Sequence, residues 1–214
     1  MKIALLGAES TGKTQLALDL ASHVAQLGKT VAVVPEVLRE WCGRKQRTPQ
    51  PEEQMSIAQE QERRADEAAA VAEVAICDTT SLMVAIYSGM LFNDGSLYPF
   101  ALENQRGYDL TLLTGLDLPW VADGLQRDGP HVREPVDALV RAALDQGGIP
   151  YRVIYGDGPA RLANALAAIE AQRPARRRAW KWMCDKCSDP YCEHRLFSGA
   201  QVSRLTTGRE NSAG

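Results

Sequence analysis

The chain has 214 residues, of which 45% are hydrophobic and 24% charged, a balance typical of a soluble globular protein with a full core. This length fits one domain of ordinary size with residues to spare. The formal net charge of −3 makes nucleic acid an unfavoured partner, and no run of about 18 apolar residues predicts a membrane span. The first residues lack a signal-peptide pattern, so we expect a cytoplasmic protein with reduced thiols.

A phosphate-binding loop follows the first apolar run of the chain. Residues 7–14 read Gly-Ala-Glu-Ser-Thr-Gly-Lys-Thr and fit the pattern G-x-x-x-x-G-K-[ST]. An apolar run at residues 3–6 precedes the loop and an alternately apolar segment at 15–25 follows it, so we expect a strand, a turn and a helix. The predicted ATP or GTP contacts are Gly7, Ala8, Glu9, Ser10, Thr11, Gly12, Lys13 and Thr14.

Each part of this loop has a physical role in binding nucleotide. The glycines allow the backbone N–H groups to converge on a phosphate, and the helix N-terminus adds a favourable dipole. Lys13 is expected to reach the β- and γ-phosphates and to act in catalysis, whereas Thr14 offers its hydroxyl to Mg²⁺.

Apolar runs alternate with helix candidates through most of the chain. The runs lie at residues 2–6, 30–35, 74–77, 109–113 and 151–155, and the helix candidates at about 13–27, 52–72, 80–91, 132–147 and 159–171. This alternation predicts an α/β fold with a parallel five-stranded sheet flanked by helices. We expect a P-loop domain over residues 1–172, a basic linker and cysteine-rich module over 173–197, and a flexible polar tail over 198–214.

Asp78 closes the apolar run at residues 74–77. A carboxylate at the end of a buried strand is where a P-loop protein holds Mg²⁺, so Asp78 is a candidate catalytic residue and, with Thr14, a candidate metal ligand. The alternative is that Asp78 caps the helix that begins near Thr80, and both roles are compatible.

Glu36 stands at the end of the run at residues 30–35. Open α/β sheets bind ligands at this carboxyl edge, where a carboxylate could accept a proton from a substrate hydroxyl that attacks the γ-phosphate. Arg39 follows one helical turn later and is a candidate contact for the acceptor or a phosphate. A surface i, i+3 ion pair between Glu36 and Arg39 is the alternative.

A glycine- and proline-containing segment at residues 118–130 follows the fourth apolar run. It carries Arg127, and Arg133 comes shortly after it. A flap that brings arginines over the phosphates would exclude water and stabilise the transferring charge. A plain surface loop is the alternative.

Four segments together resemble the ribosylnicotinamide kinase domain of the bifunctional protein NadR and its AAA-type P-loop relatives. They are the loop at residues 7–14, the element Glu36-x-x-Arg39-Glu40-Trp41, the pair Asp78-Thr79, and the string PWVADGL at residues 119–125. The resemblance covers about residues 1–171 and implies a P-loop kinase that converts nicotinamide riboside to nicotinamide mononucleotide with ATP and Mg²⁺. It implies that Glu36 is the base, that Arg39 contacts substrate or phosphate, and that Arg127 and Arg133 are lid arginines.

The cysteine cluster near the C-terminus is separate from this resemblance. Its spacing, Cys184-x-x-Cys187-x-x-x-x-Cys192-x-His194, predicts a tetrahedral Zn²⁺ site. Four protein ligands make a closed site, so the zinc would be structural. The module is expected to dock on the core, on a protein partner or on a second subunit.

Three functional hypotheses follow from the sequence. The first is an ATP- and Mg²⁺-dependent kinase of a small nucleoside-like hydroxyl compound, with nicotinamide riboside the leading acceptor. The second is an ATP-hydrolysing or ATP-sensing regulator whose zinc module binds a partner. The third is a zinc-bearing nucleic-acid-binding protein that uses the basic stretch at residues 173–178.

Overall fold

Five parallel strands form the sheet at the centre of the computed structural model, which describes residues 1–121 and 129–172. In chain order they are β1 (Lys2–Leu6), β2 (Val31–Val34), β3 (Val74–Asp78), β4 (Leu110–Thr114) and β5 (Arg152–Ile154). Their order across the sheet is β2-β3-β1-β4-β5, and each neighbouring pair is parallel. The predicted five-stranded parallel sheet is confirmed.

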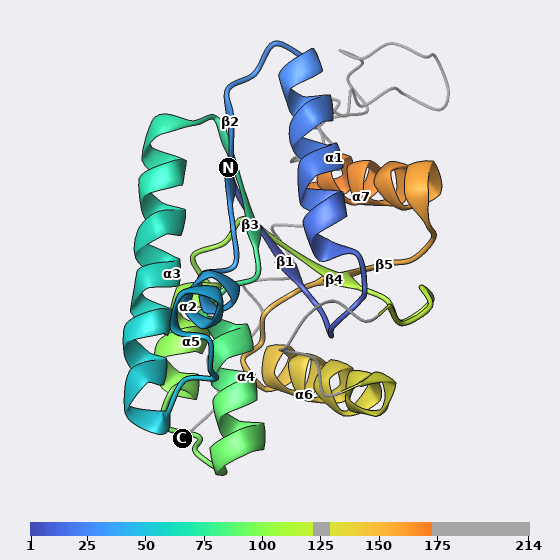
Figure 1. Ribbon diagram of the computed structural model, residues 1–214. Helices are drawn as coiled ribbons and strands as arrows, with labels where there is room; N and C mark the ends of the chain where they lie inside the picture. The colour runs from blue at the N-terminus through green and yellow to red at the C-terminus, as the bar shows by residue number, and fades with distance from the viewer. Residues whose placement is uncertain (122–128, 173–214) are drawn as a thin grey trace, which may run out of the picture. The chain divides into compact units, whose positions relative to one another are not determined.

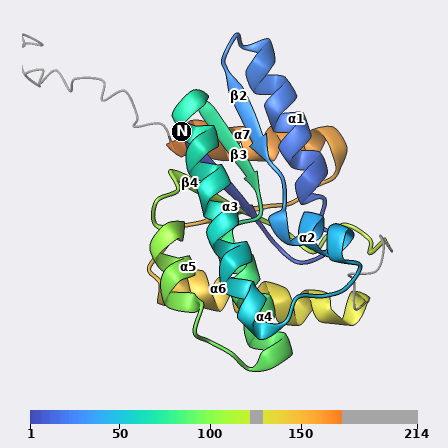
Figure 2. The same ribbon diagram turned by 60° about the vertical axis from the view of Figure 1, so that its left-hand side comes forward.

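Helices cover both faces of this sheet (Figures 1 and 2). One face packs against α1 (Lys13–Gln26) and α7 (Gly158–Gln172). The other packs against α2 (Val37–Lys45), α3 (Pro51–Val71), α4 (Ser81–Phe92), α5 (Tyr98–Gln105) and α6 (Arg133–Gln146), which a 3-10 turn at Pro130–Val132 precedes. Within the described ranges, no helix combines the length and hydrophobicity needed to cross a bilayer.

The alternation of side chains along β1 explains why both faces need cover. Ile3 and Leu5 join the apolar cluster under α1 and α7, whereas Leu6 joins the cluster under α3 to α6. All three are almost completely buried. Successive side chains of a strand point to opposite faces, so a strand that is apolar throughout must lie between two layers of helices.

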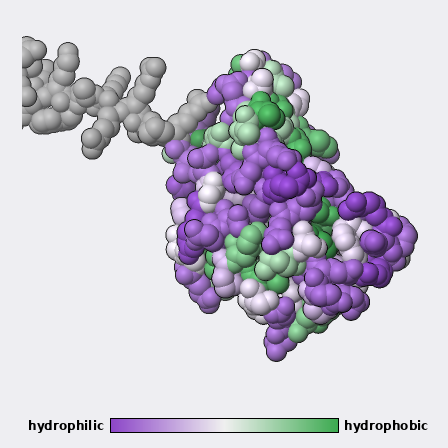
Figure 3. Space-filling view, turned by 90° about the vertical axis from the view of Figure 1, so that its left-hand side faces the viewer, coloured by the Kyte–Doolittle hydropathy of each residue, from purple (hydrophilic) through white to green (hydrophobic). Residues whose placement is uncertain are grey.

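Two helices are absent from the sequence-based prediction. Helix α2 buries only Val37 and Cys42, and α5 buries only Ala101 and Gln105, so neither segment carries a clear apolar stripe. The helix predicted at 52–72 is found at Pro51–Val71. Its charged residues mostly lie in solvent, and the side of the molecule that α3 covers is mainly hydrophilic (Figure 3).

The end of β1 approaches β4 so closely that only glycine fits at position 7. Gly7 has a φ of +144°, and an added Cβ would lie 2.2 Å from Thr114 Oγ1. Gly28 offers a comparison, because its φ is also positive, at +75°, yet a Cβ there would meet no described atom within 4 Å.

We therefore expect Gly7→Ala to lower the Tm by clearly more than Gly28→Ala. The change at Gly28 measures backbone strain alone, about 1–2 kcal/mol, which corresponds to a Tm decrease of roughly 2–8 °C for a domain of this size. The change at Gly7 adds the steric clash with Thr114. Thermal denaturation of the two variants measures both Tm values. Equal decreases would contradict the inference that Thr114 leaves no room for a side chain at position 7.

Candidate active site

The phosphate-binding loop joins β1 to α1, and buried hydroxyl groups tie it to β4. Thr11 Oγ1 lies 2.7 Å from Thr114 Oγ1. The Thr11 hydroxyl also reaches the carbonyl oxygen of Ala8 at 2.8 Å, and the Thr114 hydroxyl reaches that of Leu6 at 3.1 Å. Both threonines are fully buried. The neighbouring strand therefore fixes the path of the loop.

The ammonium group of Lys13 is turned back onto the same loop. Its Nζ donates hydrogen bonds to the carbonyl oxygens of Gly7, at 2.9 Å, and Ala8, at 2.7 Å. Lys13 is buried despite its charge. These bonds keep the cation beside the backbone that the sequence motif assigns to phosphate.

Thr14 and Asp78 meet where α1 begins and β3 ends. The Thr14 hydroxyl donates a hydrogen bond of 2.5 Å to Asp78 Oδ2. Asp78 is 3% exposed, and its second oxygen, Oδ1, is buried without a hydrogen-bond partner among the described residues. A buried carboxylate oxygen without a partner is costly, so this atom calls for a cation or a water molecule.

The donor set at this point suits Mg²⁺. This ion prefers carboxylate and hydroxyl oxygens and keeps several waters, so two protein ligands beside bound phosphates are sufficient. The capping alternative for Asp78 is not what the structure shows. Thr80 is the N-cap of α4, and its own hydroxyl accepts the hydrogen bond from the Leu82 N–H at 3.2 Å.

Glu36 and Arg39 extend this group of side chains. Arg39 Nη2 lies 3.1 Å from Glu36 Oε2, and Arg39 Nη1 donates to Thr14 Oγ1 at 3.3 Å. The i, i+3 ion pair is therefore present, and Arg39 also lies beside the phosphate-binding loop. Four of the predicted residues are therefore linked by side-chain contacts: Glu36 pairs with Arg39, Arg39 donates to Thr14, and Thr14 donates to Asp78.

The segment after β4 is braced against the phosphate-binding loop. Ser10 Oγ donates to the carbonyl oxygen of Val121 at 2.6 Å. The buried Arg133 donates from Nη2 to the carbonyl oxygens of Leu118, at 2.8 Å, and Leu116, at 3.3 Å. Arg133 therefore supports the root of the predicted lid.

The tip of the predicted lid, including Arg127, lies outside the described residues. Trp120, near its root, is half-buried, and its Nε1 has no hydrogen-bond partner in the described part of the chain.

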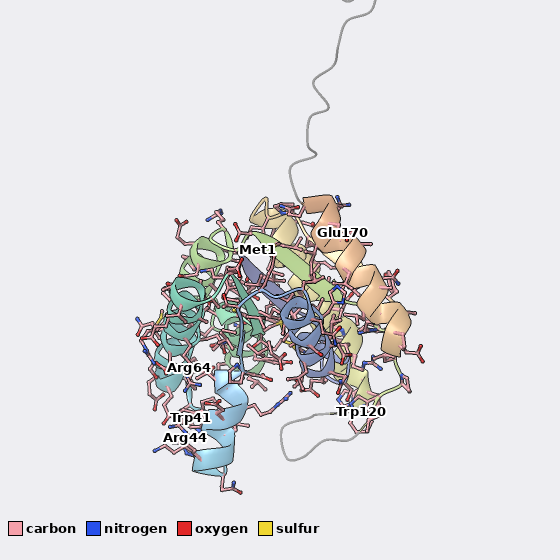
Figure 4. The ribbon with its side chains drawn as sticks, turned by 90° about the horizontal axis from the view of Figure 1, so that it is seen from above. Met1, Trp41, Arg44, Arg64, Trp120 and Glu170 are labelled. Atoms are coloured by element: carbon pink, nitrogen blue, oxygen red, sulfur yellow. The ribbon has the colours of Figure 1, made fainter. Side chains whose placement is uncertain are left out.

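Figure 4 shows Trp120 well separated from Trp41, which lies on α2. The guanidinium of Arg47 stacks over the Trp41 ring at 4.8 Å from its centroid.

Arg161 is a residue of this site that the sequence reasoning missed. It lies in the first turn of α7 and is almost fully buried. Its guanidinium donates to the carbonyl oxygens of Thr11 and Gly156 and pairs with Asp117 at 2.8 Å. Burial lowers the pKa of Arg161 below its ordinary value, while Asp117 opposes that shift. Arg161 thus joins the phosphate-binding loop to the loops after β4 and β5.

The predicted zinc ligands Cys184, Cys187, Cys192 and His194 lie outside the described residues. Within residues 1–121 and 129–172, no group of three or more His, Cys, Asp or Glu side chains could hold a metal ion. Cys42 and Cys77 are buried, as expected for core residues. Burial raises the pKa of the Cys77 thiol to about 12, which keeps it protonated and unreactive.

Comparison with known proteins finds similar folds at low sequence identity. The NadR protein, solved in complex with NAD and AMP-PNP, aligns with a TM-score of 0.64 and 17% identity over 79% of this chain. The alignment covers 48% of the NadR chain, so this protein spans about half of its length. Two structures of deoxyadenosine kinase from M. mycoides align with TM-scores of 0.52, at 13% and 15% identity. They cover 80% of this chain and 99% and 100% of theirs.

These similarities support the predicted fold, and the resemblance to the NadR kinase domain is confirmed at that level. No curated protein sequence matches the chain. The family model of the AAA domain matches residues 2–161, which is most of the chain and includes the phosphate-binding loop. The prediction of an AAA-type, nucleotide-binding P-loop domain is therefore confirmed, and the chain belongs to the AAA domain family.

Proposed function

We propose that this protein is an ATP- and Mg²⁺-dependent kinase that phosphorylates a hydroxyl group of a small nucleoside-like acceptor, with nicotinamide riboside the leading candidate. The observation that carries the proposal is the connected chain Glu36–Arg39–Thr14–Asp78 beside the phosphate-binding loop. It brings a carboxylate, a cation and two metal-ligating oxygens to one place. These are the parts that phosphoryl transfer requires.

Each side chain has a definite role in this proposal. The loop N–H groups and Lys13 hold the phosphates, and Thr14 and Asp78 hold Mg²⁺, which would neutralise charge on the phosphate oxygens. Glu36 accepts the proton of the acceptor hydroxyl as the hydroxyl oxygen bonds to the γ-phosphorus. The bond between the γ-phosphorus and the β–γ bridging oxygen breaks, and ADP is released. Arg39, which pairs with Glu36 and donates to Thr14 of the phosphate-binding loop, stabilises the negative charge on the oxygens of the transferring phosphoryl group.

The choice of acceptor rests on similarity and on the sequence string at residues 119–125. NadR and deoxyadenosine kinase are similar in fold to this chain; NadR is in complex with NAD and AMP-PNP, and the second protein is named as a kinase of a nucleoside. The string PWVADGL belongs to the resemblance to the ribosylnicotinamide kinase domain, and a generic P-loop protein has no need of it. This favours nicotinamide riboside over other nucleosides.

We expect nicotinamide riboside to raise ATP turnover above the background rate and to yield nicotinamide mononucleotide. A kinase must protect bound ATP from water until its acceptor arrives, so the correct acceptor accelerates ADP release. Coupled ADP detection across micromolar to millimolar acceptor, with product identification by mass, makes the test. Deoxyadenosine and other nucleosides form the comparison panel. Flat turnover with every member would refute the kinase proposal and favour the ATP-hydrolysing regulator.

Replacing Glu36 by glutamine is expected to lower kcat by about 10²–10⁴ while ATP binding is kept, because the amide cannot take up the proton. Glu40→Gln is the matched control. Glu40 lies on the same helix and pairs with Arg64 at 2.7 Å, away from Thr14, so its loss should change kcat by less than about twofold. Steady-state kinetics with ATP and the acceptor make the measurement. Equal rates for Glu36→Gln and the wild type would exclude Glu36 as the base.

The C-terminal zinc module remains part of the proposal. Purified protein is expected to contain about one zinc ion per chain, held by Cys184, Cys187, Cys192 and His194. Metal analysis of protein purified without chelators tests this, and Cys187→Ser should reduce the zinc content. The change Cys42→Ser, at a buried cysteine of the P-loop domain, is the control that should leave it unchanged. Wild-type protein free of zinc would end the hypothesis.

A further inference from the structure

A single buried carboxamide holds the backbone on both sides of Glu36. Gln61 lies on α3 and is 1% exposed. Its Oε1 accepts a hydrogen bond from the Val37 N–H at 2.9 Å, and its Nε2 donates to the carbonyl oxygen of Pro35 at 3.4 Å. Pro35 and Val37 are the two chain neighbours of Glu36. The side chain of Gln61 therefore brackets the candidate base.

The local chain needs such a support at this point. Strand β2 ends at Val34, and Pro35 has no N–H with which to continue the ladder to β3. Helix α2 begins at Val37, whose N–H is one of the unpaired groups of a helix start, and the N-cap Glu36 forms no side-chain cap. Gln61 supplies a partner for the Val37 N–H and for the Pro35 carbonyl at this junction of strand and helix.

The next residue of α3 acts in the same way on the segment that carries Asp78. Glu62 is buried, and it accepts hydrogen bonds from the Ser81 N–H at 2.8 Å and from the Tyr108 hydroxyl at 2.9 Å. Ser81 is the first residue of α4, three positions after Asp78. Two consecutive residues of one helix thus hold the two segments that bear the candidate base and the candidate metal ligand.

A third contact joins α3 to α2 at the surface. Arg64 Nη1 pairs with Glu40 at 2.7 Å, and Figure 4 shows Arg64 near the start of α2. This pair is partly exposed, so solvent screens it and it stabilises the arrangement only weakly. The buried bonds of Gln61 are therefore the stronger link between α3 and the start of α2.

The geometry points to Gln61 as a positioning residue for Glu36: by fixing both neighbours of Glu36 relative to α3, it sets the distance between the base and the Asp78 segment. The inference rests on the proposed function, in which Glu36 takes the proton. A displacement of about 1 Å at a reacting group is sufficient to cost about 10²-fold in rate.

The chain offers a close control for this inference. Gln54 also lies on α3, two turns earlier, and is likewise 1% exposed. Its Oε1 is buried without a hydrogen-bond partner among the described residues. Gln54 therefore matches Gln61 in residue type, helix and burial, but it holds no backbone next to Glu36.

The experiment compares Gln61→Met with Gln54→Met in the 214-residue chain. Methionine keeps the length of the side chain and removes its hydrogen bonds. With the nucleoside that gives the highest wild-type turnover in the panel above, Gln61→Met should lower kcat about 10–100-fold and leave the KM for ATP within about twofold. Gln54→Met should leave both constants within about twofold. If Gln61→Met does not fold, Gln61→Asn, which keeps the amide but cannot span both contacts, carries the same expectation.

A double-mutant cycle separates positioning from general packing. If Gln61 acts through Glu36, adding Gln61→Met to Glu36→Gln should lower kcat by less than about twofold further. Three outcomes would overturn the inference while the kinase proposal stands. The double variant could lose activity by the full further factor, Gln61→Met could leave kcat unchanged, or Gln61→Met and Gln54→Met could lower kcat equally. A wild type that no nucleoside activates would instead refute the proposed function, and the inference with it.

Discussion

The hydrogen bond between Thr14 and Asp78 is the interaction on which the rest of the site depends. It joins the first turn of α1 to the end of β3, at a point where β1 and β3 are adjacent strands and Leu5 pairs with Asp78. Because the strands are parallel, their carboxyl ends meet at one edge, and the loops that follow them must share that edge. The phosphate-binding loop and the carboxylate therefore come together as a result of strand order.

Buried arginines then give this edge its shape. Arg133 and Arg161 place guanidinium groups among backbone carbonyls and one carboxylate, and both are at least nine-tenths buried. A buried cation is costly unless hydrogen bonds compensate it; here carbonyl oxygens and Asp117 do so, although Arg133 Nε has no partner among the described residues. Together the two arginines hold residues 116–118, the root of the segment that leads away from β4.

The sequence predicted the sheet well because its signals are local. The apolar run at residues 74–77 and the glycines at 7 and 12 are each sufficient to indicate a strand or a turn. Gln61 and Arg161 gave no such signal. In the sequence Gln61 looks the same as Gln54, and its contacts lie 24 and 26 positions away. Arg161 reaches Thr11 across 150 positions. Such roles depend on contacts between single polar side chains and distant parts of the chain. These contacts produce no hydrophobic periodicity and no motif spacing in the sequence, so the sequence does not indicate them.

The hydrogen bonds of Lys13 to its own loop have a consequence for ligand choice. The ammonium already has two carbonyl partners, Gly7 and Ala8, and such charge-assisted bonds are worth about 1.5–3 kcal/mol each. Because the ammonium is held at a fixed point of the loop, it favours ligands whose negative charge reaches that point. A polyphosphate does so, since its several oxygens engage the loop N–H groups and the ammonium together. Isolated phosphate has fewer oxygens to offer, so the loop should discriminate by phosphate number even before an acceptor is present.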